Sequence, residues 1–182
     1  LTDIIRNNAE RVSTIISNVL SMSRRDARRP ERFGLTPWLA AFREEFCATM
    51  QLDPARLTVQ QLDGDLEIRV DASQLRQVVW NLCENALRHG GGQTGPIEIR
   101  CGRLKPSARP YLEVADRGPG IPPEHAERIF EPFFSGQQQG SGLGLFLARE
   151  LAQGNAATLL YEPRPGGGTV FRMVFSDPSR WE

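Results

Sequence analysis

The 182-residue sequence predicts an α/β (α+β) two-layer sandwich, in which one mixed β-sheet is covered by helices on one face. Strand-like and helical segments alternate irregularly along the chain, which disfavours a doubly wound parallel sheet. Hydrophobic residues make up 40% of the chain, enough for a real core, and an amphipathic helix precedes the sandwich. We therefore expect one domain with an N-terminal helical appendage.

Residues 1–26 have the apolar spacing of a single amphipathic helix. The apolar positions are Ile5, Val12, Ile15, Ile16, Val19 and Met22. Such a stripe favours a bundle helix that meets another helix and a second subunit; a plain amphipathic helix packed on the domain is the alternative. Residues 27–35 are charged, contain Pro30 and are typical of a linker. The main domain is expected at 36–176, with a tail at 177–182.

The beginning of the domain carries signals for a helix and a hairpin. Thr36 suits a helix cap and Pro37 suits the first helical position. The apolar side chains that follow at helical spacing are Trp38, Leu39, Phe42 and Phe46. Strand patterns at 57–62 and 66–70 flank Asp63-Gly64, a turn pair that predicts a β-hairpin.

A long helix is predicted next, because Asp71 and Gln74 have the spacing of a capping box. Its core-facing positions are Leu75, Val78, Val79, Leu82 and Ala86. The glycines at 90–92 predict the end of this helix.

The second half of the domain combines strands with one more helix. Strand patterns occur at 97–104 and 111–115, and a helical pattern occurs at 142–153. A terminal hairpin is predicted to join 157–161 to 169–175 through a glycine-rich turn. This order supports a mixed sheet rather than a parallel one.

Charge and cysteine content exclude several functions. Lys and Arg number 22 and Asp and Glu number 22, without a basic stripe, so nucleic acid is not an expected partner. No apolar run approaches the roughly 20 residues that cross a bilayer. The odd number of cysteines, Cys47, Cys83 and Cys101, indicates reduced thiols rather than a disulfide framework or a zinc site.

Asn81 and Asn85 are four residues apart and share one face of the long predicted helix, away from its apolar stripe. Amide oxygens are suitable ligands for Mg²⁺ when a triphosphate supplies the negative charge. Arg88 follows near enough to meet a phosphate. A pair of amides on a helix surface and a solvated cation at a helix end are the alternatives.

Asp116 follows a hydrophobic strand and precedes Gly118 and Gly120. A carboxylate at this position can accept a hydrogen bond from the exocyclic amino group of adenine, whereas guanine presents a carbonyl there and would be rejected. The glycines allow the backbone to approach a flat base closely. An ordinary Asp-x-Gly turn is the alternative.

A glycine-rich run at 140–144 opens the helix predicted at 142–153. It has neither the Walker pattern nor the spacing of a dinucleotide-binding fingerprint. Backbone N–H groups at such a helix start favour phosphate, although a flexible loop has the same composition. The preceding stretch, 121–141, combines aromatic anchors with a polar tail and is typical of a lid. Its aromatic residues also suit a plain core.

In combination and order, four motifs resemble those of the catalytic domain of sensor histidine kinases, which belong to the GHKL, or Bergerat-fold, ATPases. The segments that resemble the N, G1, F and G2 boxes are 81–85, 116–120, 130–134 and 140–144. The resemblance covers 71–175 and implies a Bergerat fold with ATP and Mg²⁺ as cofactors. The helix at 1–26 is similar to the second helix of the dimerisation and phosphotransfer bundle.

The resemblance also implies roles for individual residues. Asn85 would be the principal Mg²⁺ ligand with Asn81 in support, and Asp116 would read adenine. The candidate catalytic residues are Asn81, Glu84, Asn85 and Arg88. The candidate nucleotide-binding residues are Asp116, Gly118, Gly120, Ile121, Phe134, Gly140, Ser141, Gly142, Leu143 and Gly144. The lid has Ser135-Gly136-Gln137 where the family commonly has Thr-Thr-Lys, so it lacks a cation for the γ-phosphate.

The partners implied are a second copy of the chain and a response regulator. The chain starts at Leu1 without Met, and we take it as a fragment whose phosphoacceptor histidine lies upstream. Neither His89 nor His125 precedes an acidic residue, so neither is proposed as the phosphorylated group. We expect a homodimer through the N-terminal bundle in the full-length protein. The domain is expected in the cytoplasm, and inner-membrane anchoring of the full-length protein is left open.

Asn81 also separates this chain from some relatives. ATPases of the gyrase and Hsp90 type place a water-activating Glu at the position that Asn81 occupies here. Because this chain lacks that Glu, phosphoryl transfer is favoured over hydrolysis. The stretch 18–25, together with Trp38, resembles the pilin-regulating branch of sensor kinases. The alternatives are a GHKL ATPase that drives conformational change and an anti-sigma-type regulatory serine kinase.

Overall fold

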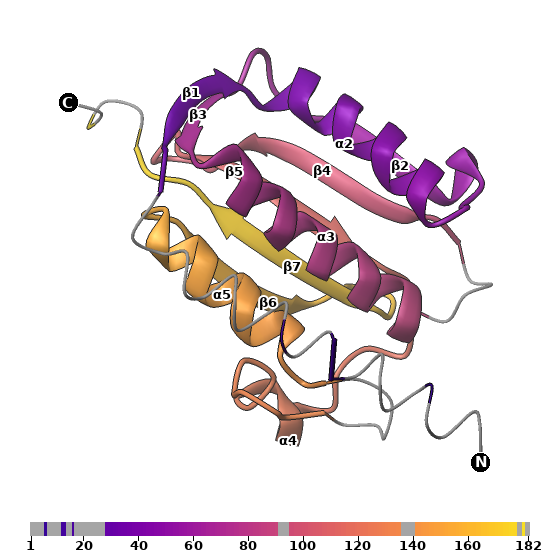
Figure 1. Ribbon diagram of the computed structural model, residues 1–182. Helices are drawn as coiled ribbons and strands as arrows, with labels where there is room; N and C mark the ends of the chain where they lie inside the picture. Colours follow the sequence, from indigo (N-terminus) through magenta and orange to yellow (C-terminus); the bar gives the residue numbers. More distant parts are fainter. Residues whose placement is uncertain are drawn as a thin grey trace.

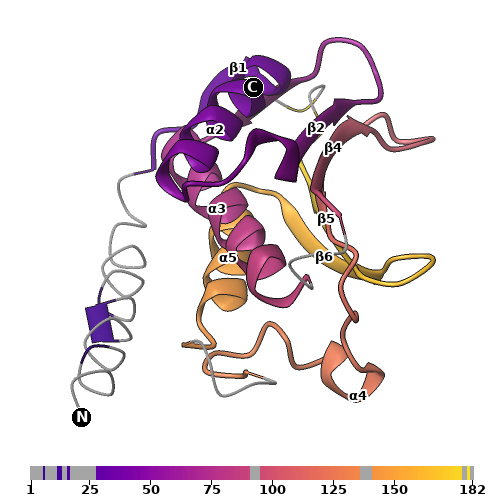
Figure 2. The same ribbon diagram turned by 90° about the vertical axis from the view of Figure 1, so that its right-hand side faces the viewer.

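The residues that the computed structural model describes are 6, 12, 13, 16, 28–90, 95–135, 141–177 and 180. They form a two-layer sandwich, with a five-stranded mixed sheet and helices on one of its faces (Figures 1 and 2). This arrangement confirms the predicted fold class. Most of the helix expected at 1–26 lies outside the described residues; its described positions are helical, and Val12 and Ile16 are about half exposed.

The main sheet has the strand order β2-β4-β5-β7-β6. These strands are β2 (Leu57–Gln61), β4 (Ile97–Arg103), β5 (Pro110–Ala115), β7 (Thr169–Val174) and β6 (Thr158–Pro163). β2 pairs with β4 in parallel, and the other three pairings are antiparallel. The strands expected at 97–104 and 111–115 and the terminal hairpin are confirmed, because alternating apolar residues and a glycine-rich turn define them locally.

The face of the sheet turned away from the helices carries a row of ion pairs. Glu113 on β5 lies between Arg100 on β4 and Arg172 on β7 in the strand register. The Nε atoms of the two arginines lie 2.8 and 2.9 Å from its carboxylate oxygens. Arg172 also pairs with Glu162 on β6 at 3.0 Å. Because Glu113 is only 3% exposed, these two cations offset the cost of burying its charge.

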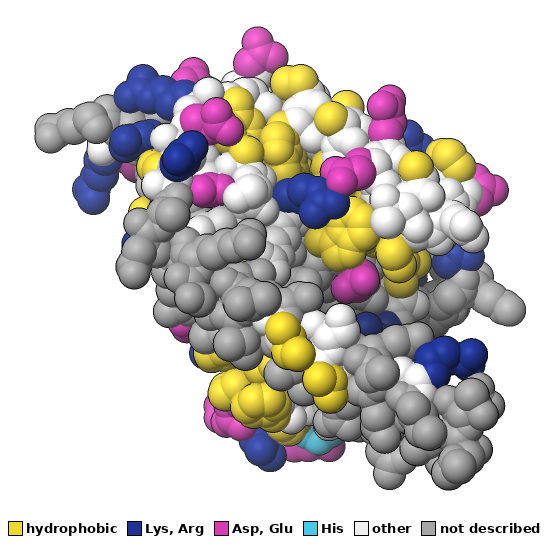
Figure 3. All heavy atoms as spheres, viewed as in Figure 1, with side chains coloured by type: hydrophobic (Ala, Val, Ile, Leu, Met, Phe, Trp, Pro, Cys, Tyr) yellow, Lys and Arg dark blue, Asp and Glu magenta, His cyan; other side chains and the backbone are white. Residues whose placement is uncertain are grey.

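The covering layer consists of α2 (Leu35–Thr49), α3 (Ala72–His89) and α5 (Gly144–Gly154). All five apolar positions predicted for the core side of the long helix are buried on α3. Aromatic rings join α2 to α3, since the ring centroids of Phe46 and Trp80 are 4.7 Å apart. Hydrophobic side chains gather on the outer face of this layer, over α2 and α3 (Figure 3). No helix among the described residues is long and apolar enough to cross a bilayer.

The hairpin predicted around Asp63-Gly64 is wrong. β2 belongs to the main sheet, whereas β3 (Glu67–Val70) pairs with β1 (Glu31–Gly34) in a separate two-stranded sheet. The Asp63 carboxylate accepts a hydrogen bond from the backbone N–H of Arg103 at 2.6 Å, so it anchors the end of β4. The chain does turn at Asp63-Gly64, but each of the two strands pairs with a strand from a distant part of the chain.

The linker and helix start predicted between residues 27 and 37 also need correction. β1 occupies the last part of the expected linker, and α2 begins at Leu35 with Gly34 as its N-cap. Thr36 makes no capping hydrogen bond, and Pro37 lies within the first turn, where a missing N–H leaves no helical bond unmade. The three cysteines are buried and form no disulfide, as expected.

Asp71 caps α3 as predicted, but only half of the capping box forms. Its Oδ1 accepts from the N–H groups of Ser73 and Gln74 at 3.0 and 3.1 Å. The backbone N–H of Asp71 donates to Asn155 Oδ1 at 2.8 Å, and Asn155 Nδ2 donates to the Gln74 side chain at 2.8 Å. Asn155, just beyond α5, therefore replaces the reciprocal contact and ties the end of α5 to the start of α3.

The chain enters the domain at the same place. The backbone N–H of Arg29 donates to Asp71 Oδ2 at 2.9 Å, and the Arg28 guanidinium donates to the Gly154 carbonyl at the end of α5. Burial alone would raise the pKa of the Asp71 carboxyl. The donors from Arg29, Ser73 and Gln74 outweigh that effect and hold this pKa below its usual range.

Asp71→Asn is expected to lower the free energy of unfolding by about 1 kcal/mol near neutral pH. A carboxyl with a depressed folded-state pKa stabilises the fold above its unfolded pKa and loses this contribution as the pH falls through the folded pKa. The difference from wild type should therefore shrink when urea unfolding is repeated at about pH 3. Asp65→Asn, which removes an exposed carboxyl, is the control and should leave the free energy of unfolding close to that of wild type. If the difference in unfolding free energy between wild type and Asp71→Asn is the same at both pH values, the lowered pKa of Asp71 is contradicted.

Candidate functional site

The predicted site residues gather around the C-terminal half of α3. Asn81 Nδ2 donates a hydrogen bond to the Gly144 carbonyl at 3.2 Å, which joins α3 to the start of α5. A Cβ atom on Gly118 would lie 2.5 Å from the His89 carbonyl oxygen, so the loop after β5 packs directly on the end of α3. The backbone N–H of Phe133 donates to the Gly142 carbonyl at 3.0 Å. All four motifs therefore lie in one connected region, in the lower part of Figure 1.

Asp116 is 4% exposed, and the structure determines the direction of its carboxylate. Oδ1 accepts from the N–H groups of Gly118 and Thr169 at 2.8 and 3.3 Å, and Oδ2 accepts from the Thr169 hydroxyl. An ionised carboxylate offers about four acceptor positions. Oδ2 thus retains an acceptor position that fits one further donor, such as an exocyclic amino group.

Thr169 is a site residue that the sequence reasoning missed. It is the first residue of β7, and both its N–H and its hydroxyl bind the Asp116 carboxylate. Its carbonyl accepts from the Asp116 backbone N–H at 3.0 Å. The hairpin itself was predicted, but its pairing with β5 is a long-range contact that no local signal reveals.

Gly118 and Gly120 are required by chain packing within the protein. Besides its contact with the end of α3, a Cβ atom on Gly118 would lie 2.7 Å from the Gly90 Cα. Gly120 has a φ of +80° and faces the backbone of Gly168, so that a Cβ atom on Gly120 would lie 3.3 Å from the Gly168 carbonyl oxygen. The predicted reason, room for a flat base, stays a prediction.

The polar residues of α3 differ in how they are engaged. Asn81 is held by its bond to Gly144, whereas the structure gives the Asn85 amide no hydrogen bond to another described residue. Both side chains are half-buried, as is Glu84, and Arg88 is exposed. At the end of the helix, burial and then the Arg88 charge lower the pKa of His89, against an opposing effect of Asp116. The Asn81 bond uses only the amide nitrogen, so the amide oxygens of both Asn81 and Asn85 accept no hydrogen bond from another described residue.

The helix predicted from Gly142 begins two residues later. Gly142 has a φ of +67°, which a right-handed helix does not use, and a Cβ atom there would lie 2.5 Å from the Phe133 carbonyl carbon. α5 starts at Gly144 with Leu143 as its N-cap, and Ser141 Oγ accepts from the Leu143 N–H at 3.3 Å. The first N–H groups of α5 have no partner within the helix and suit an anion. Gly140 lies outside the described residues.

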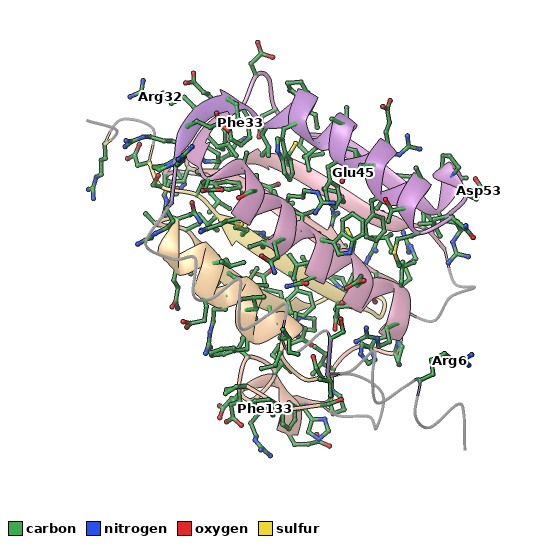
Figure 4. All side chains as sticks on the ribbon, in the orientation of Figure 1. Arg6, Arg32, Phe33, Glu45, Asp53 and Phe133 are labelled. Atoms are coloured by element: carbon green, nitrogen blue, oxygen red, sulfur yellow. The ribbon has the colours of Figure 1, made fainter. Side chains whose placement is uncertain are left out.

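The predicted lid divides into core and exposed parts. Ile129 and Phe130 are buried, and Ile121 and Phe134 pack partly against the core. The Arg128 guanidinium lies 4.5 Å from the centre of the Phe134 ring. Phe133 is 69% exposed with a φ of +64°, and Figure 4 places it beside α4 (Pro123–Ala126), away from α2. Residues 136–140 of the lid lie outside the described residues.

A metal ion at this site would depend on oxygen ligands from amides and phosphates. Among the described residues, no group of three His, Cys, Asp or Glu side chains could hold a metal. The half-buried Asn85 amide, which is not engaged by its described neighbours, fits a hard ion such as Mg²⁺ that keeps several waters and binds phosphate oxygens.

Comparison with known proteins gives consistent matches. Residues 70–179 match the family described as histidine kinase-, DNA gyrase B-, and HSP90-like ATPase. The sensor protein kinase PilS of Pseudomonas aeruginosa is 40% identical over 185 residues, which cover 99% of this chain and 34% of that protein. The chain thus spans about a third of the length of this curated relative.

Solved structures agree with the sequence matches. The catalytic domain of histidine kinase ThkA superimposes with a TM-score of 0.67 at 28% identity, covering 82% of this chain and 96% of that one. Histidine kinase ThkA in complex with the response regulator protein TrrA gives a TM-score of 0.75 at 27% identity, covering 98% of this chain and 51% of that one.

Proposed function

Because this chain belongs to the family of histidine kinase-, DNA gyrase B- and HSP90-like ATPases, we propose that it is the ATP-binding catalytic part of a two-component sensor histidine kinase. Its reaction would be transfer of the ATP γ-phosphate to a histidine outside residues 1–182. The observation that carries this proposal is the buried Asp116 carboxylate, directed by Gly118 and Thr169, beside the end of α3. The resemblance to PilS supports the pilin-regulating branch.

In this proposal each group has a separate task. Asp116 accepts a hydrogen bond from the adenine amino group, and the first N–H groups of α5 donate to phosphate oxygens. Asn85 would hold Mg²⁺ through its amide oxygen, while Asn81 holds α3 against α5 through Gly144. When bound, Mg²⁺ offsets the negative charge of the phosphates. Arg88 is exposed one turn beyond Asn85 and adds positive charge near the phosphates.

The absence of a general base at position 81 supports transfer over hydrolysis. A half-buried amide that already donates to Gly144 cannot take a proton from water. His89 and His125 are unsuited as acceptors, since His89 is half-buried at the end of α3 and His125 packs edge-on against the Phe134 ring. In the complete protein, we expect two copies to form a homodimer through their N-terminal helices. A response regulator would be the final acceptor of the phosphate.

The test is a labelling experiment with γ-labelled ATP. We expect the 182-residue chain to bind Mg·ATP in calorimetry, to retain no label, and to hydrolyse ATP far more slowly than once per minute. The full-length protein should acquire an acid-labile phosphate. Label retained on the 182-residue chain, or turnover of several per minute, would contradict the proposal. Acid-stable phosphate on a partner would support a serine kinase instead.

A further inference from the structure

The turn of the β6–β7 hairpin packs onto the backbone of Asp116. Gly166, Gly167 and Gly168 have φ values of +85°, +104° and +108°, which let the turn approach closely. A Cβ atom on Gly168 would lie 2.1 Å from the Asp116 carbonyl oxygen. The backbone of Arg164 closes this turn through bonds to Gly168 and Gly167 at 3.1 and 3.0 Å. The hairpin thus forms one wall of the loop that carries Asp116.

Arg164 then extends its side chain across the end of β5. Its Nη1 donates to the Asp116 carbonyl at 3.2 Å, and its Nη2 donates to both carboxylate oxygens of Glu98 at 2.9 and 3.0 Å. Glu98 lies on β4 directly opposite Ala115, the residue before Asp116. Only 10% of the Arg164 side chain is exposed, against 52% for Arg117, the second cation that reaches Glu98.

This geometry holds the Asp116 main chain on both sides. Its N–H donates to Thr169 and its carbonyl accepts from Arg164, so the two peptide units that flank the carboxylate cannot rotate freely. A buried guanidinium needs a counter-charge, which Glu98 provides. The fixed planar fork of Arg matches a carbonyl and a carboxylate at once, whereas an ammonium would not.

We propose that Arg164, supported by Glu98, is a positioning residue for adenine recognition: it fixes the Asp116 main chain, and thereby the direction in which the carboxylate meets the base. The inference rests on the proposed nucleotide site. It adds specificity determinants from β4 and the β6–β7 hairpin, outside the four sequence motifs.

Arg164→Met keeps the length and the apolar part of the side chain but removes the fork. We expect it to weaken Mg·ATP binding about tenfold and to reduce the preference for ATP over GTP by a similar factor. Arg164→Lys should be intermediate. Glu98→Gln should also weaken ATP binding and reduce the preference for ATP over GTP. The Arg164→Met/Glu98→Gln double variant should lose little more ATP affinity than Arg164→Met alone, because the two residues act through one contact.

Arg172→Met is the matched control. Arg172 also lies on the outer face of the sheet and bonds two carboxylates, those of Glu113 and Glu162, at 2.9 and 3.0 Å. Both of these partners lie within the strands rather than in the loop that carries Asp116. The loss of Arg172 should therefore lower the melting temperature and leave the ATP-to-GTP ratio unchanged. A purely structural role for Arg164 would give the same pattern as Arg172→Met.

The outcomes separate the two proposals. If wild type binds no ATP, or binds ATP and GTP equally, the proposed nucleotide site fails. If wild type and Arg172→Met prefer ATP but Arg164→Met retains the full ATP-to-GTP ratio, only this inference fails. Circular dichroism and thermal unfolding report whether each variant folds. If Arg164→Met does not fold, the ATP-to-GTP affinity ratio of Glu98→Gln tests the inference instead.

Discussion

Asp116→Asn is expected to weaken ATP binding about 100-fold and to shift the preference toward GTP. The amide oxygen would take the place of Oδ1 and accept from Gly118 and Thr169, so the loop should still fold. The amide nitrogen would then replace Oδ2 and present a donor to the donor group of adenine. Guanine, which carries a carbonyl at that position, should lose less affinity or gain some.

Calorimetric titration of Mg·ATP and Mg·GTP into wild type and variant measures both effects. Asp53→Asn is a close control, because Asp53 Oδ1 also accepts from a backbone N–H two residues ahead, that of Ala55, at 2.9 Å. Asp53 follows α2 and lies at the edge of the molecule, away from Phe133 (Figure 4). Equal ATP affinity of wild type and Asp116→Asn would remove the adenine assignment.

Asn85→Ala is expected to reduce phosphoryl transfer at least about 100-fold, since even partners that only orient metal ligands are worth 10–100-fold. The fold should be retained, because the Asn85 amide makes no hydrogen bond to another described residue and Ala is the best helix former. The loss should appear in the Mg²⁺ dependence of ATP binding.

The control is the same titration in EDTA. Without Mg²⁺, wild type and Asn85→Ala should bind ATP equally, and added Mg²⁺ should tighten binding only in wild type. Asn81→Ala should behave differently, because it breaks the bond between α3 and Gly144 and should lower the melting temperature. If Asn85→Ala responds to Mg²⁺ as wild type does, the ligand lies elsewhere.

Local signals predicted the parts of the fold whose determinants are adjacent in sequence. Asp71 caps α3 because its carboxylate reaches N–H groups only two and three residues ahead. The turn at 165–168 forms because consecutive glycines tolerate positive φ. The apolar face of α3 follows from helical periodicity alone.

The predictions that were wrong or incomplete depend on contacts between residues that are distant in sequence. The β2–β3 hairpin was wrong because β2 pairs with β4 and β3 with β1. Asn155 completes the cap of α3 from a position far along the chain. Within the site, Asp116 was predicted from the turn that follows it, but Thr169 and Arg164 reach it from the β6–β7 hairpin and carry no motif of their own.

The contacts at the two ends of α5 restrict insertions and deletions within α3 and α5. Gly144, at its start, accepts from Asn81, and Asn155, just past its end, binds Asp71 and Gln74. The 11 residues of α5 span about 16 Å, nearly the same as the stretch of α3 from 71 to 81. One inserted or deleted residue in either helix would rotate one contact by about 100°. Insertions and deletions should therefore be tolerated in the connecting loops but not between these anchors. The anchors keep the entering chain at Arg28, which bonds the end of α5, at a constant distance from the start of that helix.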